Sequence, residues 1–196
     1  MRLPNDIRNL PHRKRLHRDR TLKWACHEAA HTMYALRHGI NFLEVRVGRE
    51  TIDANPNSDD LNCKSVDITG RLVPDPNYEY YRSSIYPTGH GWDDAAKLSL
   101  AGHAFEQIVD PHHSDLCLMF MGSANDYRQA LEFVKWGLFV EEGDADGREA
   151  ERTIDNVLIP AVRKFLLENW ESVIALGEIL NERKMLTAEE VKQAVQ

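Results

Sequence analysis

Residues 21–39, TLKWACHEAAHTMYALRHG, determine how the chain is organised. Thr21 is a favourable N-cap residue and Gly39 a favourable C′ residue, so the stretch predicts a helix over residues 22–38. One stripe of this helix is apolar and is expected to face the core: Leu22, Cys26, Ala29, Met33 and Leu36. A second stripe recurs at helical spacing on another face: His27, His31, Tyr34 and His38. The predicted helix therefore packs with one face and presents a stripe of His and Tyr side chains on another.

The second stripe begins with an HExxH motif, HEAAH at residues 27–31. Histidines four residues apart lie one above the other on a helix, so His27 and His31 can bind one tetrahedral zinc ion. Glu28 is rotated by about 100° from His27 and would lie beside the ion. There it can act as the catalytic general base toward a water that the zinc activates. The alternative is that the two histidines share a helix face without binding a metal.

A catalytic zinc site needs a third protein ligand and an open position. His38 cannot supply this ligand, because it lies roughly 10 Å further along the same helix. The sequence leaves several candidates open: His90, His103, Glu106, Asp110, the turn at residues 112–115, and Asp126. His103 and Glu106 share a helix face and could instead hydrogen-bond to a ligand imidazole. Asp126 also fits a structural role, since Ser123 and Asp126 form a capping-box pattern.

The rest of the chain predicts an α+β fold that is mostly α-helical. Strands are expected over residues 43–48 and 64–73, which gives a small early β-sheet. Residues 64–72 are also a candidate edge strand for pairing with an extended substrate. Helices are expected over residues 93–110, 124–140, 147–183 and 188–195, the later ones forming a C-terminal helical bundle. Pro160 should start or kink a helix, and Thr187 with Glu190 forms a capping box.

Composition and the length of the apolar runs indicate a globular protein without a membrane-spanning segment. The chain has 196 residues, 42% of them hydrophobic and 28% charged, which suits one globular domain. We expect no membrane-spanning segment, because the apolar runs are far shorter than roughly 20 residues. We also expect no secretory signal. The three widely spaced cysteines argue against a disulfide framework and favour a reducing compartment, so we expect a cytoplasmic protein.

The N-terminal segment is basic, whereas the remainder is acidic. Seven of the 24 Lys and Arg residues lie within residues 1–21, together with only two of the 31 Asp and Glu residues. We therefore predict a flexible basic arm over residues 1–20, either solvated or docked on its own acidic domain at residues 21–196. Contact with nucleic acid is not expected, because no aromatic or groove-reading motif accompanies the charge.

The order of motifs along the chain resembles that in the peptidase domain of the FtsH family. The members of this family are membrane-anchored AAA+ zinc proteases. The motifs are HEAAH, ITGRLVPDP, LSLAGHAFEQIV, GSANDYRQALEFV and ENWESVIALGEILNERKMLTAEEV, and together they extend from residue 21 to about residue 192. The resemblance implies a zincin-like fold with His27 and His31 as zinc ligands and Glu28 as the catalytic glutamate. It also implies that Asp126, in the GSAND segment, is the third ligand.

The sequence departs from this family in several places. Ala30 replaces a glycine of the family's HEAGH motif, and His103 stands where the family typically has arginine. Gly102 would still allow its helix to approach the zinc helix closely. The 196 residues contain no GxxxxGK[ST] sequence. The resemblance therefore predicts an ATP-independent zinc metalloendopeptidase that acts on protein or peptide substrates. It leaves open whether the protein forms a homo-oligomer.

Two other functions stay open. The first is a small regulatory zincin of the ImmA/IrrE type that cuts one specific protein, with a glutamate such as Glu106 as the third ligand. The second is a catalytically inactive metal-binding interaction module, with the basic arm as its contact. Zinc content after substitution of each candidate ligand separates the first from the FtsH-like reading.

Overall fold

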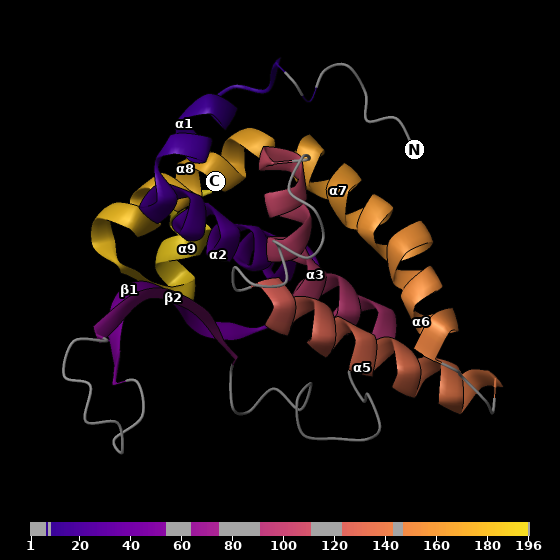
Figure 1. Cartoon of the computed structure of the whole chain (residues 1–196). Coiled ribbons are helices and arrows are strands. Elements are labelled where there is room, and N and C mark those ends of the chain that lie inside the picture. The colour runs from indigo at the N-terminus through magenta and orange to yellow at the C-terminus, as the bar shows by residue number, and fades with distance from the viewer. Residues whose placement is uncertain are drawn as a thin grey trace.

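A computed structural model describes Ile7 and residues 9–53, 64–74, 91–110, 123–142 and 147–195. The described chain is mostly helical and carries a small antiparallel sheet, as predicted (Figure 1). Its elements are α1 (Arg13–Arg18), α2 (Arg20–Arg37), β1 (Phe42–Asp53), β2 (Lys64–Pro74), α3 (Trp92–Val109), α5 (Ser123–Glu142), α6 (Gly147–Thr153), the π-helical turn η3 (Ile154–Leu158), α7 (Ile159–Glu168), α8 (Trp170–Arg183), β3 (Met185–Thr187) and α9 (Ala188–Ala194). None of the helices in these ranges is long and apolar enough to cross a membrane.

The predicted metal helix is α2, and it runs through the middle of the molecule (Figure 1). Its N-cap is Asp19, whose side chain accepts a hydrogen bond from the Leu22 backbone N–H at 3.0 Å. The prediction of Thr21 as the N-cap is therefore wrong: Asp19 ends α1 in an extended conformation and supplies an equally good cap two residues earlier. Gly39 follows the helix with φ +67°, as its predicted place after the C-terminus requires.

Helix α2 is surrounded by α3, α8 and the two long strands, and residues 22–35 are all buried. Gly177 of α8 allows the closest approach. A Cβ at this position would lie 2.3 Å from Cys26 Sγ and 2.9 Å from Cys26 Cα. Burial raises the pKa of the Cys26 thiol to about 12, so this cysteine packs as a neutral apolar side chain. Close packing of α2 against α8 thus depends on glycine, which has no side chain, at residue 177.

Substitution Gly177→Ala is expected to lower the free energy of unfolding by about 2 kcal/mol. Overpacking against a neighbouring backbone costs about 1–3 kcal/mol, and the helical preference of Ala returns no more than about 1 kcal/mol. Urea denaturation measures the change. Gly147→Ala is the matched control, because its Cβ would meet nothing closer than Lys135 Cε at 3.7 Å. Equal stability of Gly177→Ala and wild type would contradict the close packing of Gly177 against Cys26.

The sheet has the strand order β2-β1-β3, and both pairings are antiparallel. Strands β1 and β2 confirm the two predicted strands and pair in a register that places Val47 opposite Gly70. The third strand, β3, was not predicted. It pairs Leu186 with Val45 and leads into α9, whose Thr187–Glu190 capping box is confirmed. The C-terminal segment therefore closes one side of the sheet.

The predicted helix over residues 147–183 consists of several pieces. Residues 147–168 run through α6, the π-helical turn η3 and α7, and Pro160 lies in the first turn of α7. Pro160 has no backbone N–H, so the wider π turn directly before it accommodates the missing hydrogen bond. The chain leaves helical geometry at Asn169 (φ −112°, ψ 18°) and continues as α8.

The described part of the N-terminal segment packs on the body of the protein. Residues 13–18 form α1, and Leu16 and Ile7 are buried. Arg13 Nε donates to the Val109 carbonyl at 2.9 Å, and Trp170 Nε1 donates to the Pro11 carbonyl at 3.1 Å. Two apolar anchors and these bonds hold the segment against α3 and α8. The division of the chain at residue 21 stays a prediction.

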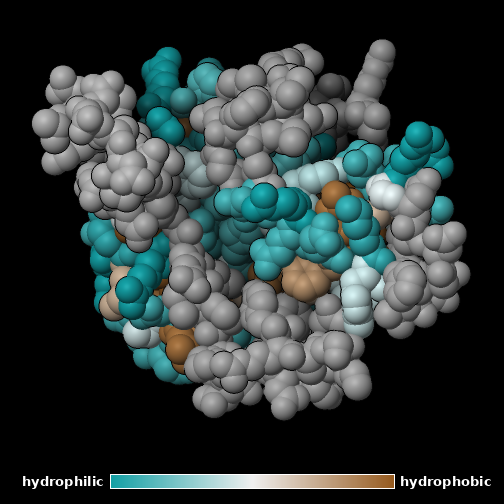
Figure 2. All heavy atoms as spheres, turned by 60° about the horizontal axis from the view of Figure 1, so that its bottom comes forward, coloured by the Kyte–Doolittle hydropathy of each residue, from teal (hydrophilic) through white to brown (hydrophobic). Residues whose placement is uncertain are grey.

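The described surface is mainly hydrophilic. On the face shown in Figure 2, hydrophobic residues appear only as small separate areas. Among residues whose side chains the structure describes, the large exposed hydrophobic ones are Leu43, Val157 and Met185. They belong to β1, η3 and β3, so scattered single residues account for the exposed apolar area.

Candidate metal centre

Helix α2 brings His27 and His31 together as the HExxH spacing predicts. Their Nε2 atoms lie 3.3 Å apart, and the two residues are 2% and 8% exposed. Each Nδ1 atom donates to an acceptor on α3: His27 to Glu106 Oε1 at 2.9 Å and His31 to the Leu98 carbonyl at 2.7 Å. These bonds fix both rings and leave the two Nε2 atoms directed at one point, which is the arrangement that metal-binding histidines use.

Asp126 is the acidic residue that completes this group. It lies in the first turn of α5, and its Oδ2 atom is 3.1 Å from His27 Nε2 and 3.4 Å from His31 Nε2. These three ligand atoms all lie within 4.8 Å of one another. Oδ2 is buried and has no partner with hydrogen-bond geometry, although it sits close to both imidazoles. A carboxylate oxygen placed in this way is suited to share a cation with the two nitrogens.

Gly102 of α3 allows the two imidazoles to lie directly against this helix. A Cβ at residue 102 would lie 2.3 Å from His27 Nε2, 2.4 Å from His27 Cε1 and 2.5 Å from His31 Nε2, so any side chain here would displace both rings. Glycine therefore preserves the arrangement in which the two Nε2 atoms lie close together. Two imidazole nitrogens and a carboxylate oxygen are a donor set that fits a divalent cation. The buried His27 and His31 and the partly buried Asp126 can therefore hold a metal ion.

The other predicted third ligands take different places. Glu106 faces Nδ1 of His27, and its second oxygen is buried without a hydrogen-bond partner among the described residues. His103 is buried on α3 and accepts a hydrogen bond from Gln107 at 3.0 Å. Asp110 pairs with His17 at 3.3 Å. His90 and residues 112–115 lie outside the described residues.

Glu28 lies beside the three candidate ligands and is 5% exposed. Its Oε1 atom is 3.8 Å from His27 Nε2, which is too far for a hydrogen bond but close to any group bound at the centre. Burial raises the pKa of the Glu28 carboxyl. A carboxylate with a raised pKa is a stronger base, so the position and environment of Glu28 suit proton transfer.

The buried charges compensate one another in the metal-free protein. Burial lowers the pKa of His27, but Asp126 and Glu106 outweigh it and raise that pKa well above its ordinary range. Asp126 likewise raises the pKa of His31 against the effect of burial. For Asp126, burial opposes ionisation, but His31 and His27 hold its pKa below the usual range. Acidic neighbours thus favour the protonated form of both imidazoles, and a divalent cation competes with these protons.

Substitution Asp126→Ala is expected to weaken metal binding at least about 100-fold, because it removes a direct ligand. Glu106→Ala should weaken it by about 10-fold, the lower end of the range for residues that orient a ligand imidazole. Competition with a chromophoric chelator measures both affinities. A larger loss for Glu106→Ala than for Asp126→Ala would contradict the ligand set and favour a glutamate as the third ligand.

Two parts of the centre were not foreseen from the sequence. The Leu98 carbonyl holds His31, but a backbone acceptor is available at every residue and gives no signal in the sequence. The glycine at residue 102 was noted for close helix packing, whereas the structure places it directly behind the two Nε2 atoms. Its position one helical turn before Glu106 was the available signal, because both residues then face α2.

Comparison with known proteins leaves the function to be inferred from the site. No protein-family model matches the chain, and no curated protein is significantly similar to it. The geometry around His27, His31 and Asp126 therefore carries the functional argument, together with the position of Glu28.

Proposed function

We propose that the protein is a zinc-dependent metalloendopeptidase with a zincin-like fold, that it acts without ATP, and that its substrates are proteins or peptides. The observation that carries the proposal is the approach of Asp126 Oδ2 to within 3.1 Å of His27 Nε2 and 3.4 Å of His31 Nε2. Two imidazoles and one carboxylate, with a position left open, are the ligand set of catalytic zinc sites in peptidases. The resemblance of the motif order to the FtsH peptidase domain supports the same function.

Each residue of the centre has a definite role in this proposal. His27, His31 and Asp126 would hold the zinc, and Glu106 and the Leu98 carbonyl would orient the two rings. A bound zinc ion polarises a peptide carbonyl and makes a water more acidic. Glu28 would accept the proton of the attacking water and return it to the leaving amine. Burial keeps this carboxylate away from bulk solvent and raises its basicity.

The geometry favours this reading over a regulatory zincin with Glu106 as a ligand. Glu106 Oε1 is bonded to Nδ1 of His27, on the opposite side of the ring from Nε2. Two histidines and one carboxylate also bind iron in oxygenases, so the identity of the metal is part of the test. A glutamate adjacent to the first histidine on one helix is the feature that specifically suits hydrolysis.

The purified protein is expected to contain one zinc ion per chain and to cleave denatured casein. A chelator should abolish cleavage, added zinc should restore it, and ATP should have no effect. Elemental analysis and a gel-based cleavage assay measure these properties. Bound zinc without any cleavage would overturn the enzymatic proposal in favour of an inactive binding module, and stoichiometric iron would overturn the choice of zinc.

A further inference from the structure

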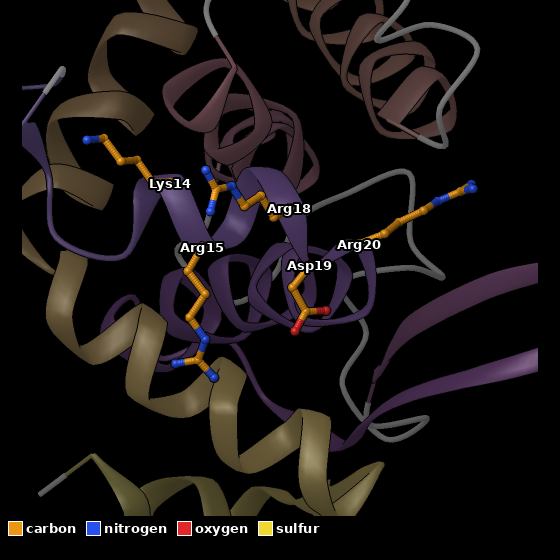
Figure 3. Close-up of a pocket in the computed structure, with 5 residues that line it drawn as sticks. All are labelled: Lys14, Arg15, Arg18, Asp19 and Arg20. Atoms are coloured by element: carbon orange, nitrogen blue, oxygen red, sulfur yellow. The ribbon is translucent and has the colours of Figure 1, made fainter.

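A hollow lies where α1 and α2 meet, at the N-terminal end of the helix that carries His27 and His31. The chain bends here because Asp19 adopts φ −103° and ψ 94° between the two helices. The hollow measures about 540 Å³ and is lined by Lys14, Arg15, Arg18, Asp19 and Arg20. Figure 3 shows that the four cationic side chains fan out from the bend in different directions. The hollow is therefore a broad cationic surface rather than a closed pocket for one small anion.

Two of the five lining residues already have partners within the molecule. Arg15 Nη1 forms an ion pair with Glu178 at 2.5 Å, and the Asp19 carboxylate caps α2 through the Leu22 N–H at 3.0 Å. Lys14, Arg18 and Arg20 are exposed, and they form no ion pair with a carboxylate in the described ranges. Within the described residues these three positive charges have no acidic partner. We name Lys14, Arg18 and Arg20 the α1–α2 basic patch.

The patch stands out against the charge of the rest of the chain. Residues 22–196 contain 17 Lys and Arg but 29 Asp and Glu, whereas residues 1–21 contain seven and two. Arg15 and His17 already bind acidic groups of the body, Glu178 and Asp110. A local cationic surface on an acidic protein attracts a partner whose negative charge is confined to one segment.

We propose that the α1–α2 basic patch docks a segment of another polypeptide that is rich in Asp and Glu. Lys14 and Arg18 lie one helical turn apart, about 6 Å along α1. Alternate side chains of an extended peptide are spaced by about 6.6 Å, so two carboxylates on one face of such a segment can meet both cations. Arg20 extends the surface past the bend and offers a guanidinium fork that matches a carboxylate.

Two other classes of anion fit the patch less well. Nucleic acid binding depends on neutralising many phosphates, and three cations on a body with excess negative charge provide little of this. A membrane surface would be reinforced by exposed apolar side chains. The large exposed hydrophobic residues of the described side chains lie on β1, η3 and β3, away from α1. A short acidic segment needs only the local contacts that the patch provides.

The test is a fluorescence anisotropy titration of the full chain against a labelled Glu-rich peptide at low ionic strength. A Gln-rich peptide of the same length is the control probe, and mass spectrometry verifies that both stay intact. We expect binding of the Glu-rich peptide only. The triple substitution Lys14→Glu, Arg18→Glu and Arg20→Glu should weaken it at least about 10-fold, because attraction becomes repulsion. The neutral triple substitution to Gln should weaken it less, and circular dichroism establishes that both variants fold.

A matched control separates the patch from the overall charge. Arg37 at the C-terminal end of α2, Arg152 on α6 and Lys164 on α7 are exposed, and changing all three to Glu alters the net charge equally. This control should change the affinity by less than about twofold. An equal loss in the control variant, or no binding of the Glu-rich peptide by the wild type, would overturn the proposal. Tighter binding of duplex DNA or of anionic vesicles than of the peptide would also overturn it. None of these outcomes depends on the presence of zinc or on peptide cleavage.

Discussion

Substitution Glu28→Gln is expected to reduce the cleavage of denatured casein by about 10³-fold while leaving the metal in place. A glutamine keeps the size of the side chain but cannot accept a proton, and positioned general bases contribute roughly 10²–10⁴-fold. Metal binding should persist because Glu28 is not one of the three ligand residues, and its Oε1 atom lies 3.8 Å from His27 Nε2. Cleavage rates and elemental analysis on the same preparation measure both properties.

The control for Glu28→Gln is Glu132→Gln, since Glu132 is largely exposed on α5 and makes only a surface ion pair with Lys135 at 3.6 Å. It should cleave casein at the wild-type rate. If Glu28→Gln retained full activity with its metal bound, the carboxylate would not be the base, and the peptidase assignment would fail. If the variant lost its metal as well, Glu28 would contribute to metal binding, and its assignment as a base rather than a ligand would be wrong.

The parts of the site that lie close together in the sequence could be predicted from it. His27, Glu28 and His31 belong to one helix, and helical spacing alone puts both imidazoles on one face. The structure confirms this helix and directs both Nε2 atoms to the same point. The predicted first residue of this helix was wrong because Asp19 and Thr21 are both favourable N-cap residues. Only the short helix α1 before the bend shows which one is used.

The proposed third ligand, Asp126, could not be derived from local sequence. Asp126 is 99 residues away from His27, and an Asp in a first helical turn also has a structural explanation. The structure shows both features in one residue, since Asp126 begins α5 and also approaches the imidazoles. Only the order of motifs along the chain pointed to it beforehand. Long-range packing of α5 on α3 makes this contact, and no periodic pattern within α5 encodes it.

Strand β3 and one hydrogen-bond partner of the histidines also could not be predicted from local sequence. Three residues are too few for alternation to be recognised, so Met185–Thr187 carries no strand pattern of its own. Pairing with β1 makes it a strand. Glu106 was foreseen as a hydrogen-bond partner because its side chain is ionisable and suitably placed. The role of the Leu98 carbonyl was not predicted. Every residue has a backbone carbonyl, and only the position of His31 beside it distinguishes this one.

Substitution Gly102→Ala is expected to weaken metal binding at least about 100-fold in a protein that stays folded. The added methyl group would lie 2.3 Å from His27 Nε2, 2.4 Å from His27 Cε1 and 2.5 Å from His31 Nε2, so both rings would have to leave the positions that bring their Nε2 atoms together. Alanine is also a better helix former than glycine by about 1 kcal/mol, which offsets part of the crowding. Chelator competition measures the affinity, and thermal denaturation measures stability.

The variant Gly137→Ala distinguishes displacement of the imidazoles from general crowding between α3 and α5. Its Cβ would lie 2.2 Å from the Trp92 ring, and its three nearest atoms all belong to that ring. We therefore expect both variants to lose stability, but only Gly102→Ala to lose affinity for metal. Native affinity in Gly102→Ala would mean that the ion sits elsewhere. A loss of metal affinity in both variants would mean that helix spacing, rather than contact of residue 102 with the imidazoles, controls metal binding.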